Sequence, residues 1–78
     1  MRSEVTNLEY NVSFIWDEES LVWIATSEEI EGLALESGSF DALIERLKYA
    51  IPELLELNGQ PQAEKINIYC DRTEKVMV

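Results

Sequence analysis

Histidine is absent from this 78-residue sequence, and cysteine occurs once, as Cys70. A lone cysteine cannot form an internal disulfide, and without histidine the chain lacks the usual zinc ligands. The usual general base is missing too, because histidine is the side chain whose unperturbed pKa lies nearest to neutrality. We therefore expect no disulfide scaffold, no metal or other cofactor and no enzyme. Cys70 alternates with isoleucines and is interpreted as a buried structural thiol.

Long apolar runs are missing as well. The longest, such as residues 21–25, fall far short of the roughly 20 apolar residues that a membrane-spanning helix requires. Residues 1–7 are polar, carry no apolar segment typical of a signal peptide, and are expected to be frayed. The sequence thus predicts a cytoplasmic protein that does not associate with a membrane.

Basic residues are few: six Lys and Arg stand against sixteen Asp and Glu, for a formal charge of −10. Such a surface repels phosphate backbones, so we expect no direct binding of nucleic acid. The acidic excess is explained either by solubility or by the attraction of a basic protein partner. A chain of this length buries only about 60–65% of its unfolded surface, so either association or a well-packed core must supply stability.

Alternating apolar and polar residues predict the first strand. Leu8, Tyr10, Val12, Phe14 and Trp16 fall on one side, and Ile15 is the exception on the other. A polar turn at residues 17–20 leads to a second strand at 21–26 that is apolar on both faces. That strand is either central and covered on both sides, or its second face meets another chain. Residues 33–36 read as a short third strand after Gly32.

A helix is predicted after Ser39, which is suited to an N-cap position. Its apolar stripe is Phe40, Leu43, Ile44, Leu47 and Ile51, and Pro52 must kink or restart it because proline lacks the N–H donor. Residues 58–61 end the helix, residues 65–71 alternate as a fourth strand, and 72–78 form a tail or a short edge strand. The prediction is one α+β domain over residues 1–78. It is a two-layer βββαβ sandwich with sheet order 3-2-1-4 and one kinked helix on one face.

The segment Trp23–Ser27, with Gly32-Leu33 and Pro52–Leu55, resembles the HicB-like antitoxin group, in particular its short stand-alone members of unassigned function. The resemblance covers residues 8–57 and implies a partial RNase H-like fold. It also implies a partner, a small basic HicA-like toxin that cleaves messenger RNA. Many relatives carry an additional DNA-binding domain, for which the chain has no room after Val78. Glu31 departs from the group, since many relatives have proline there.

The acidic connections are the candidate protein-binding residues, and the alternative reading is that they are ordinary charged loops. They comprise Glu18, Glu19, Glu28, Glu29 and Glu31. A nuclease would need carboxylates converging on metal ions, whereas Glu9, Asp17, Glu36, Asp41 and Asp71 flank the predicted strand ends and are interpreted as solvated.

An uncovered sheet face is the candidate self-association surface, and Val22, Ile24 and Tyr69 are expected to lie on it. Trp23 is added to the candidate self-association residues because its strand is apolar on both faces, so that a place in the core or at an interface stays open for it. The function predicted is that of a non-catalytic protein-binding module resembling an antitoxin. The alternative is a self-associating structural or regulatory domain without a toxin partner. In either case the chain is expected to form a homo-oligomer, most simply a dimer.

Overall fold

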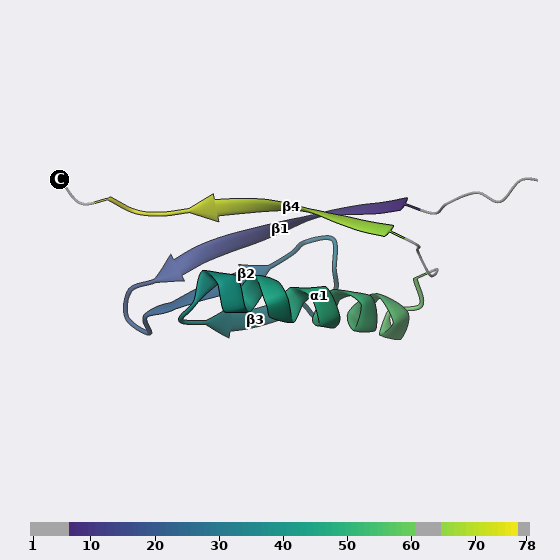
Figure 1. Ribbon diagram of the computed structural model, residues 1–78, viewed down its shortest axis with the longest axis horizontal. Coiled ribbons are helices and arrows are strands. Elements are labelled where there is room, and N and C mark those ends of the chain that lie inside the picture. The colour runs from purple at the N-terminus through teal and green to yellow at the C-terminus, as the bar shows by residue number, and fades with distance from the viewer. Residues whose placement is uncertain (1–6, 61–64, 77–78) are drawn as a thin grey trace, which may run out of the picture.

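The computed structural model describes residues 7–60 and 65–76 as a four-stranded mixed sheet with one helix. The elements are β1 (Asn7–Asp17), β2 (Val22–Thr26), β3 (Ala34–Ser37), α1 (Phe40–Leu57) and β4 (Lys65–Thr73). The strand order is β3-β2-β1-β4, in which β1–β2 and β2–β3 are antiparallel and β1–β4 is parallel (Figure 1). The predicted α+β class, βββαβ order and sheet order are therefore confirmed.

The β1–β2 hairpin turns without the Asn-Gly pair typical of tight hairpins. The Asp17 side chain accepts a hydrogen bond from the N–H of Glu19 at 3.0 Å, which is the local bond that aspartate commonly forms in turns. Leu21 then adopts a left-handed conformation with φ of 56°. These two residues reverse the chain so that Asp17 pairs with Val22.

The helix begins and ends as its sequence predicts. The Ser39 hydroxyl accepts a hydrogen bond from the N–H of Ala42 at 3.2 Å, which makes Ser39 the N-cap. At the other end Gly59 takes a φ of 74°, and its N–H bonds the carbonyl of Glu56 at 3.1 Å. The bond from Gln60 N–H to the Leu55 carbonyl, 2.9 Å long, completes a Schellman-type end.

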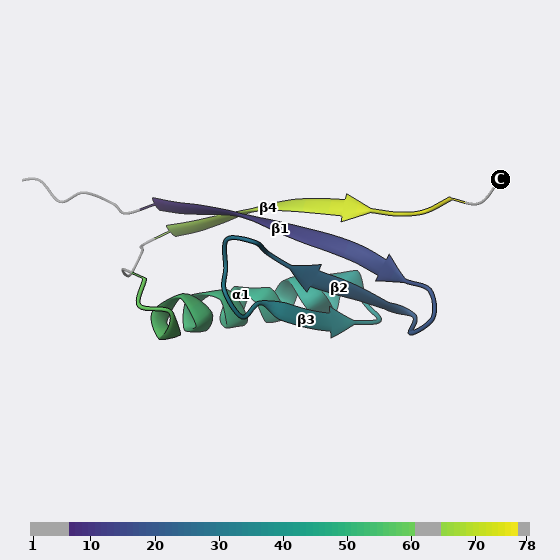
Figure 2. The ribbon, with the colours of Figure 1, turned by 180° about the vertical axis from the view of Figure 1, so that it is seen from behind.

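Pro52 lies inside α1, which continues through it as one helix (Figure 2). The restart considered from the sequence is therefore wrong. Pro52 still offers no N–H to the carbonyl of Lys48. The buried side chains Ile51 and Leu55 anchor the turns on both sides of Pro52 against the sheet, which accounts for the continuity.

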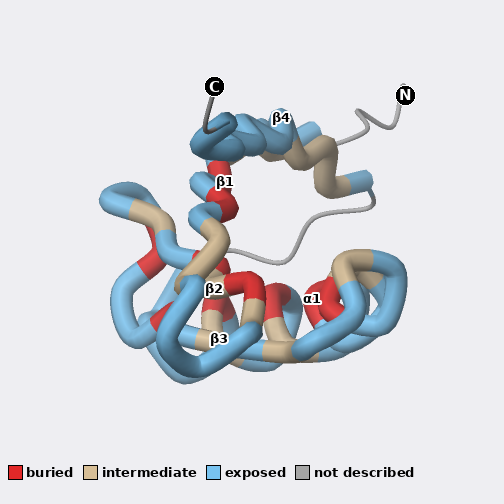
Figure 3. Tube along the Cα trace, turned by 90° about the vertical axis from the view of Figure 1, so that its left-hand side faces the viewer, coloured by how far each residue is buried: buried red, intermediate tan, exposed pale blue. Residues whose placement is uncertain are grey.

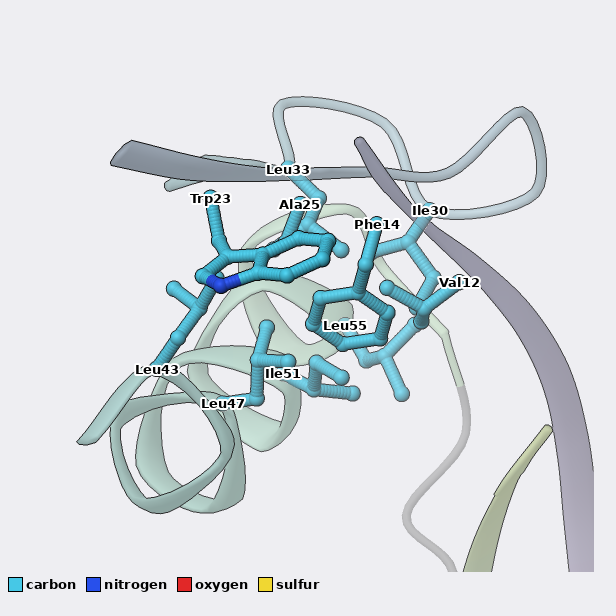
Figure 4. Close-up of a cluster of buried hydrophobic side chains, with 10 residues drawn as sticks. All are labelled: Val12, Phe14, Trp23, Ala25, Ile30, Leu33, Leu43, Leu47, Ile51 and Leu55. Atoms are coloured by element: carbon cyan, nitrogen blue, oxygen red, sulfur yellow. The ribbon is translucent and has the colours of Figure 1, made fainter. Parts of the chain in front are cut away.

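The core lies between α1 and the strands β1, β2 and β3. Ten hydrophobic residues are buried there (Figure 4): Val12, Phe14, Trp23, Ala25, Ile30, Leu33, Leu43, Leu47, Ile51 and Leu55. The ring centroids of Phe14 and Phe40 are 4.9 Å apart, and those of Trp23 and Phe40 are 5.5 Å apart. No residue of β4 is buried, and β4 lies away from α1 in Figure 3. The helix therefore covers β2, β3 and the middle of β1, whereas β4 lies at the margin of the core: Ile66 and Ile68 are half-buried against it and Cys70 is exposed.

Candidate functional site

The second face of the sheet, opposite α1, carries a small apolar patch. Register places Ile15 opposite Ile24 and Asp17 opposite Val22 on this open face. Ile15 is 55% exposed, whereas Val22 and Ile24 are half-buried. We call Ile15, Val22 and Ile24 the apolar patch. The exception in the alternation of β1, Ile15, is thus the residue that extends the patch from β2 onto β1.

Trp23 does not belong to the open face. It is only 7% exposed and packs toward α1, with its ring centroid 5.4 Å from that of Trp16. Trp23, for which the sequence left core and interface open, therefore lies in the core, on the face opposite to the other candidate self-association residues Val22 and Ile24. Neighbouring strand residues point to opposite faces, so the burial of Trp23 is what directs Val22 and Ile24 outward.

Tyr69 lies on the open face as predicted but outside the apolar patch. It is 54% exposed and pairs with Asn11, four positions along β1 from Ile15. Four strand residues span about 13 Å, and the polar Ser13 lies between. The structure therefore does not bring Tyr69 together with Val22 and Ile24.

The five predicted acidic residues are separated into two groups by β2. Glu18 and Glu19 lie in the hairpin before β2, and the other three lie in the loop after it; all five are exposed. Because β2 has five residues, the two groups are about 13 Å or more apart. The acids do not form one cluster but lie beyond the two ends of β2; Glu28 and Glu29 line an open-face hollow with Ile15, whereas Glu18 lines one with Trp16 and Trp23.

Glu29 has a structural role that the other four acids do not share. Its carboxylate accepts hydrogen bonds from the backbone N–H of Asn11 at 2.6 Å and from the Asn11 side-chain amide at 3.0 Å. The Ser27 hydroxyl donates to the Asn11 carbonyl at 2.7 Å and accepts from the N–H groups of Glu29 and Ile30 at 3.1 and 3.3 Å. Pairing between β1 and β2 stops at Ser13 and Thr26. Beyond that point the side chains of Glu29 and Ser27, in place of β2, form hydrogen bonds with the backbone of β1 at Asn11.

Two hollows lie near β2, one on the open face and one on the side of the sheet where α1 lies. One, of about 520 Å³, lies on the open face beside this loop and is lined by Asn11, Ser13, Ile15, Thr26, Ser27, Glu28 and Glu29. The other, of about 290 Å³, is lined by Trp16, Glu18, Trp23, Glu74 and Lys75. Beside it the Arg72 guanidinium stacks on the rings of Trp23 and Phe40, at 4.4 and 4.5 Å from their centroids. Sequence reasoning ended the fourth strand at residue 71 and missed Arg72, which lies in β4, because the polar run 72–75 carries no signal of such a contact.

Metal-ligand groups and membrane-spanning helices were sought in the described ranges 7–60 and 65–76. No group of three or more His, Cys, Asp or Glu residues there is placed to hold a metal ion, and no helix there is long and apolar enough to cross a membrane. Cys70 is exposed, so its interpretation as a buried thiol was wrong: β4 is not covered by α1. Partial desolvation still raises the pKa of the Cys70 thiol, which disfavours the reactive thiolate.

Comparisons with known proteins give a family and a structural neighbour. Residues 9–77 match a family described as a domain of unknown function (DUF1902). The crystal structure of a hypothetical protein from the extremely thermophilic bacterium Thermus thermophilus is similar, with 31% sequence identity and a TM-score of 0.78. The match covers 90% of this chain and 99% of the other. No curated protein sequence matches significantly.

Proposed function

The chain belongs to the DUF1902 family, whose description leaves the function open, and from that premise we propose that it is a non-catalytic protein-binding domain. The observation that carries the proposal is the apolar patch of Ile15, Val22 and Ile24 with acidic residues beyond both ends of β2. Protein interfaces commonly combine an apolar centre with a polar rim. The open face of the sheet is the binding surface in this proposal.

A small basic protein is the partner that fits this surface. The formal charge of −10 favours a positively charged partner and disfavours a nucleic acid. The sequence resemblance to the HicB-like antitoxins narrows the class to a HicA-like toxin. In this proposal the domain binds such a toxin and masks its RNA-binding surface, since the acidic rim would compete with a phosphate backbone.

The test is to measure the binding kinetics of the small basic protein encoded by the neighbouring reading frame. Four exposed rim acids are neutralised together: Glu18→Gln, Glu19→Gln, Glu28→Gln and Glu31→Gln. Glu29 is kept because its carboxylate bonds the backbone of β1. We expect the association rate to fall by about 10-fold at low salt and to lose much of its salt dependence, because rim charges act mainly on the on-rate.

A matched control removes four charges from the helix, on the other side of the molecule. It carries Asp41→Asn, Glu45→Gln, Glu53→Gln and Glu56→Gln. If the control slows association as much as the rim variant does, the effect is one of net charge and the rim does not position the partner. A second variant, Ile24→Asp, should abolish stable binding by placing a charge in the centre of the apolar patch.

Self-association without a toxin partner is the second candidate function. The exposed side chains of β4, Tyr69 and Cys70 among them, favour it, because they lie apart from the apolar patch. If the wild-type chain does not bind the basic protein at micromolar concentration but still self-associates, this second candidate replaces the first.

A further inference from the structure

The outer edge of β4 is the feature that the proposed function does not use. β4 is the terminal strand of the sheet, and within the described residues β1 is its sole strand neighbour. An unpaired strand edge presents a row of backbone N–H and C=O groups and readily pairs with another strand. β4 is nine residues long and contains no proline, and its charged residues, which can protect a strand edge, lie near its two ends at Lys65, Asp71 and Arg72.

The two faces of β4 differ in character. Parallel register with β1 puts Ile66, Ile68 and Cys70 on the side of the sheet where α1 lies, next to Leu8, Tyr10 and Val12. Ile66 and Ile68 pack against the margin of the core and stay half-buried, because α1 lies mainly over β2 and β3, and Cys70 is exposed. The opposite face of β4 carries polar residues, among them Lys65 and Asp71. An apolar strip thus runs along an open strand edge.

We propose that β4 pairs antiparallel with β4 of a second copy of this chain, around a two-fold axis at Ile68. This register places Lys65 opposite Asp71 of the second copy, twice because of the symmetry. It also places Ile66 opposite Cys70, and Ile68 opposite its own counterpart. Opposite charges that face each other across strands stabilise a pair, and apolar neighbours extend the strip. The result is one continuous eight-stranded sheet with both helices on the same face.

Neighbouring registers are less favourable. An axis at Tyr69 places Ile66 opposite Arg72, and an axis at Cys70 places Ile68 opposite Arg72 and Lys65 opposite Lys75. With an axis at Asn67, Cys70 and Asp71 have no facing residue, because the β4 strand of the second copy begins at Lys65. Among these registers, the one centred on Ile68 alone combines paired opposite charges with an unbroken apolar strip.

Charge also favours β4 as the contact. Two chains of charge −10 repel each other over most of their surfaces. Along β4 the balance reverses, because Lys65 and Arg72 outnumber Asp71 and give a sum of +1 (2 − 1). The pairing therefore joins the two chains at one of their least acidic segments. It also leaves the apolar patch on β1 and β2 free, so that this inference stands apart from the proposed function.

A disulfide trap tests the register. The variant Ile66→Cys places the new thiol opposite Cys70 of the second copy, at a Cα separation of about 4.5–5.5 Å, which a disulfide can span. Residues 66 and 70 of one chain are about 13 Å apart along the strand and cannot bond to each other. With oxidised glutathione we expect most of this variant to migrate as a covalent dimer. The wild type and the double variant I66C/C70S should stay largely uncrosslinked.

Charge exchange provides a second test that does not depend on cysteine. Lys65→Asp and Asp71→Lys each place like charges opposite one another twice, and each should weaken dimerisation by at least about 10-fold. The double variant K65D/D71K restores both pairs and should return the dimer to within about 3-fold of wild type, as measured by sedimentation equilibrium.

Three results would overturn the inference. In the first, the wild type is strictly monomeric at several hundred micromolar. In the second, the wild type crosslinks through Cys70 as efficiently as I66C does. In the third, the double variant K65D/D71K dimerises no more strongly than either single variant. The affinity of K65D for the basic protein distinguishes failure of this inference from failure of the proposed function. K65D should bind the basic protein as tightly as wild type does, because its apolar patch is intact. If K65D no longer binds the basic protein, that result would count against the proposed function instead.

Discussion

Replacing Ser27 with alanine removes a hydroxyl that joins the loop after β2 to β1. The hydroxyl donates to the Asn11 carbonyl and accepts from the N–H groups of Glu29 and Ile30. A net hydrogen bond contributes about 0.5–1.5 kcal/mol, and three at full value would reach about 4 kcal/mol. Two of the three bonds are solvent-exposed, so water replaces part of what is lost. We therefore expect a loss of about 1–2 kcal/mol, similar to the removal of a helix N-cap.

The assay is thermal and urea denaturation followed by tryptophan fluorescence, at one fixed protein concentration because association changes apparent stability. For a domain of this size each kcal/mol corresponds to about 4–8 °C in Tm, so Ser27→Ala should melt about 5–15 °C lower. The backbone amides of Glu29 and Ile30 should also exchange faster with solvent. Both N–H groups lose their hydrogen-bond acceptor, so we expect faster exchange even at Ile30, which is only 1% exposed.

Ser20→Ala is the matched control, since Ser20 lies in the hairpin and engages through its backbone N–H. It should leave Tm within about 2 °C of wild type, as surface substitutions away from structural bonds usually do. If Ser27→Ala is as stable as Ser20→Ala and the exchange of Ile30 is unchanged, then the Ser27 bonds do not hold the loop. In that case the placement of the acidic rim would need another cause.

Two further substitutions test contacts outside this loop. Arg72→Ala removes the guanidinium from the Trp23 ring and should cost about 0.5–1 kcal/mol, because a cation–π contact at a partly exposed site has that size. Tryptophan fluorescence should shift in the native state, and an Arg72→Ala variant with native emission and Tm would contradict the stacking. Pro52→Ala restores an N–H donor for the carbonyl of Lys48 and should raise the free energy of unfolding by about 1–2 kcal/mol. This gain is smaller than the full cost of proline in a helix, because proline also restrains the unfolded chain. A lower Tm would show that the native backbone requires proline at this position.

Local sequence signals were enough for the elements of the fold. The Ser39 cap, the stripe ending at Ile51 and the alternation of β1 each depend on neighbours a few residues away, and the helix has the predicted start and end. The sheet order followed from the handedness of crossovers, which holds for nearly all parallel connections. These features were predictable because chain geometry alone determines them.

The surface of the sheet was harder to predict. The strand Val22–Thr26 is apolar on both faces, so its pattern does not say which face meets the helix, and it leaves open whether Trp23 lies in the core or at an interface. The answer lies in its pairing with Trp16, a contact between strands that the pattern of one strand does not reveal. The bond from Asn11 to Glu29 spans 18 residues and is likewise invisible to local patterns. Alternation in β4 indicates which face Cys70 occupies but not whether that face is covered, and the core does not extend over Cys70.

The parallel pairing of β1 with β4 also has a kinetic consequence. Asn7 pairs with Lys65, a separation of 58 residues (65 − 7), whereas β1 and β2 pair across separations of 5 to 13 residues. Closing a long loop costs entropy before any contact compensates for it, so pairings between distant segments form late in folding. During synthesis β1 therefore emerges well before its β4 partner, with the free edge of β1 exposed throughout. In a crowded polysome that edge is open to β4 of a neighbouring chain, and the parallel β1–β4 pair is where domain exchange between copies would begin.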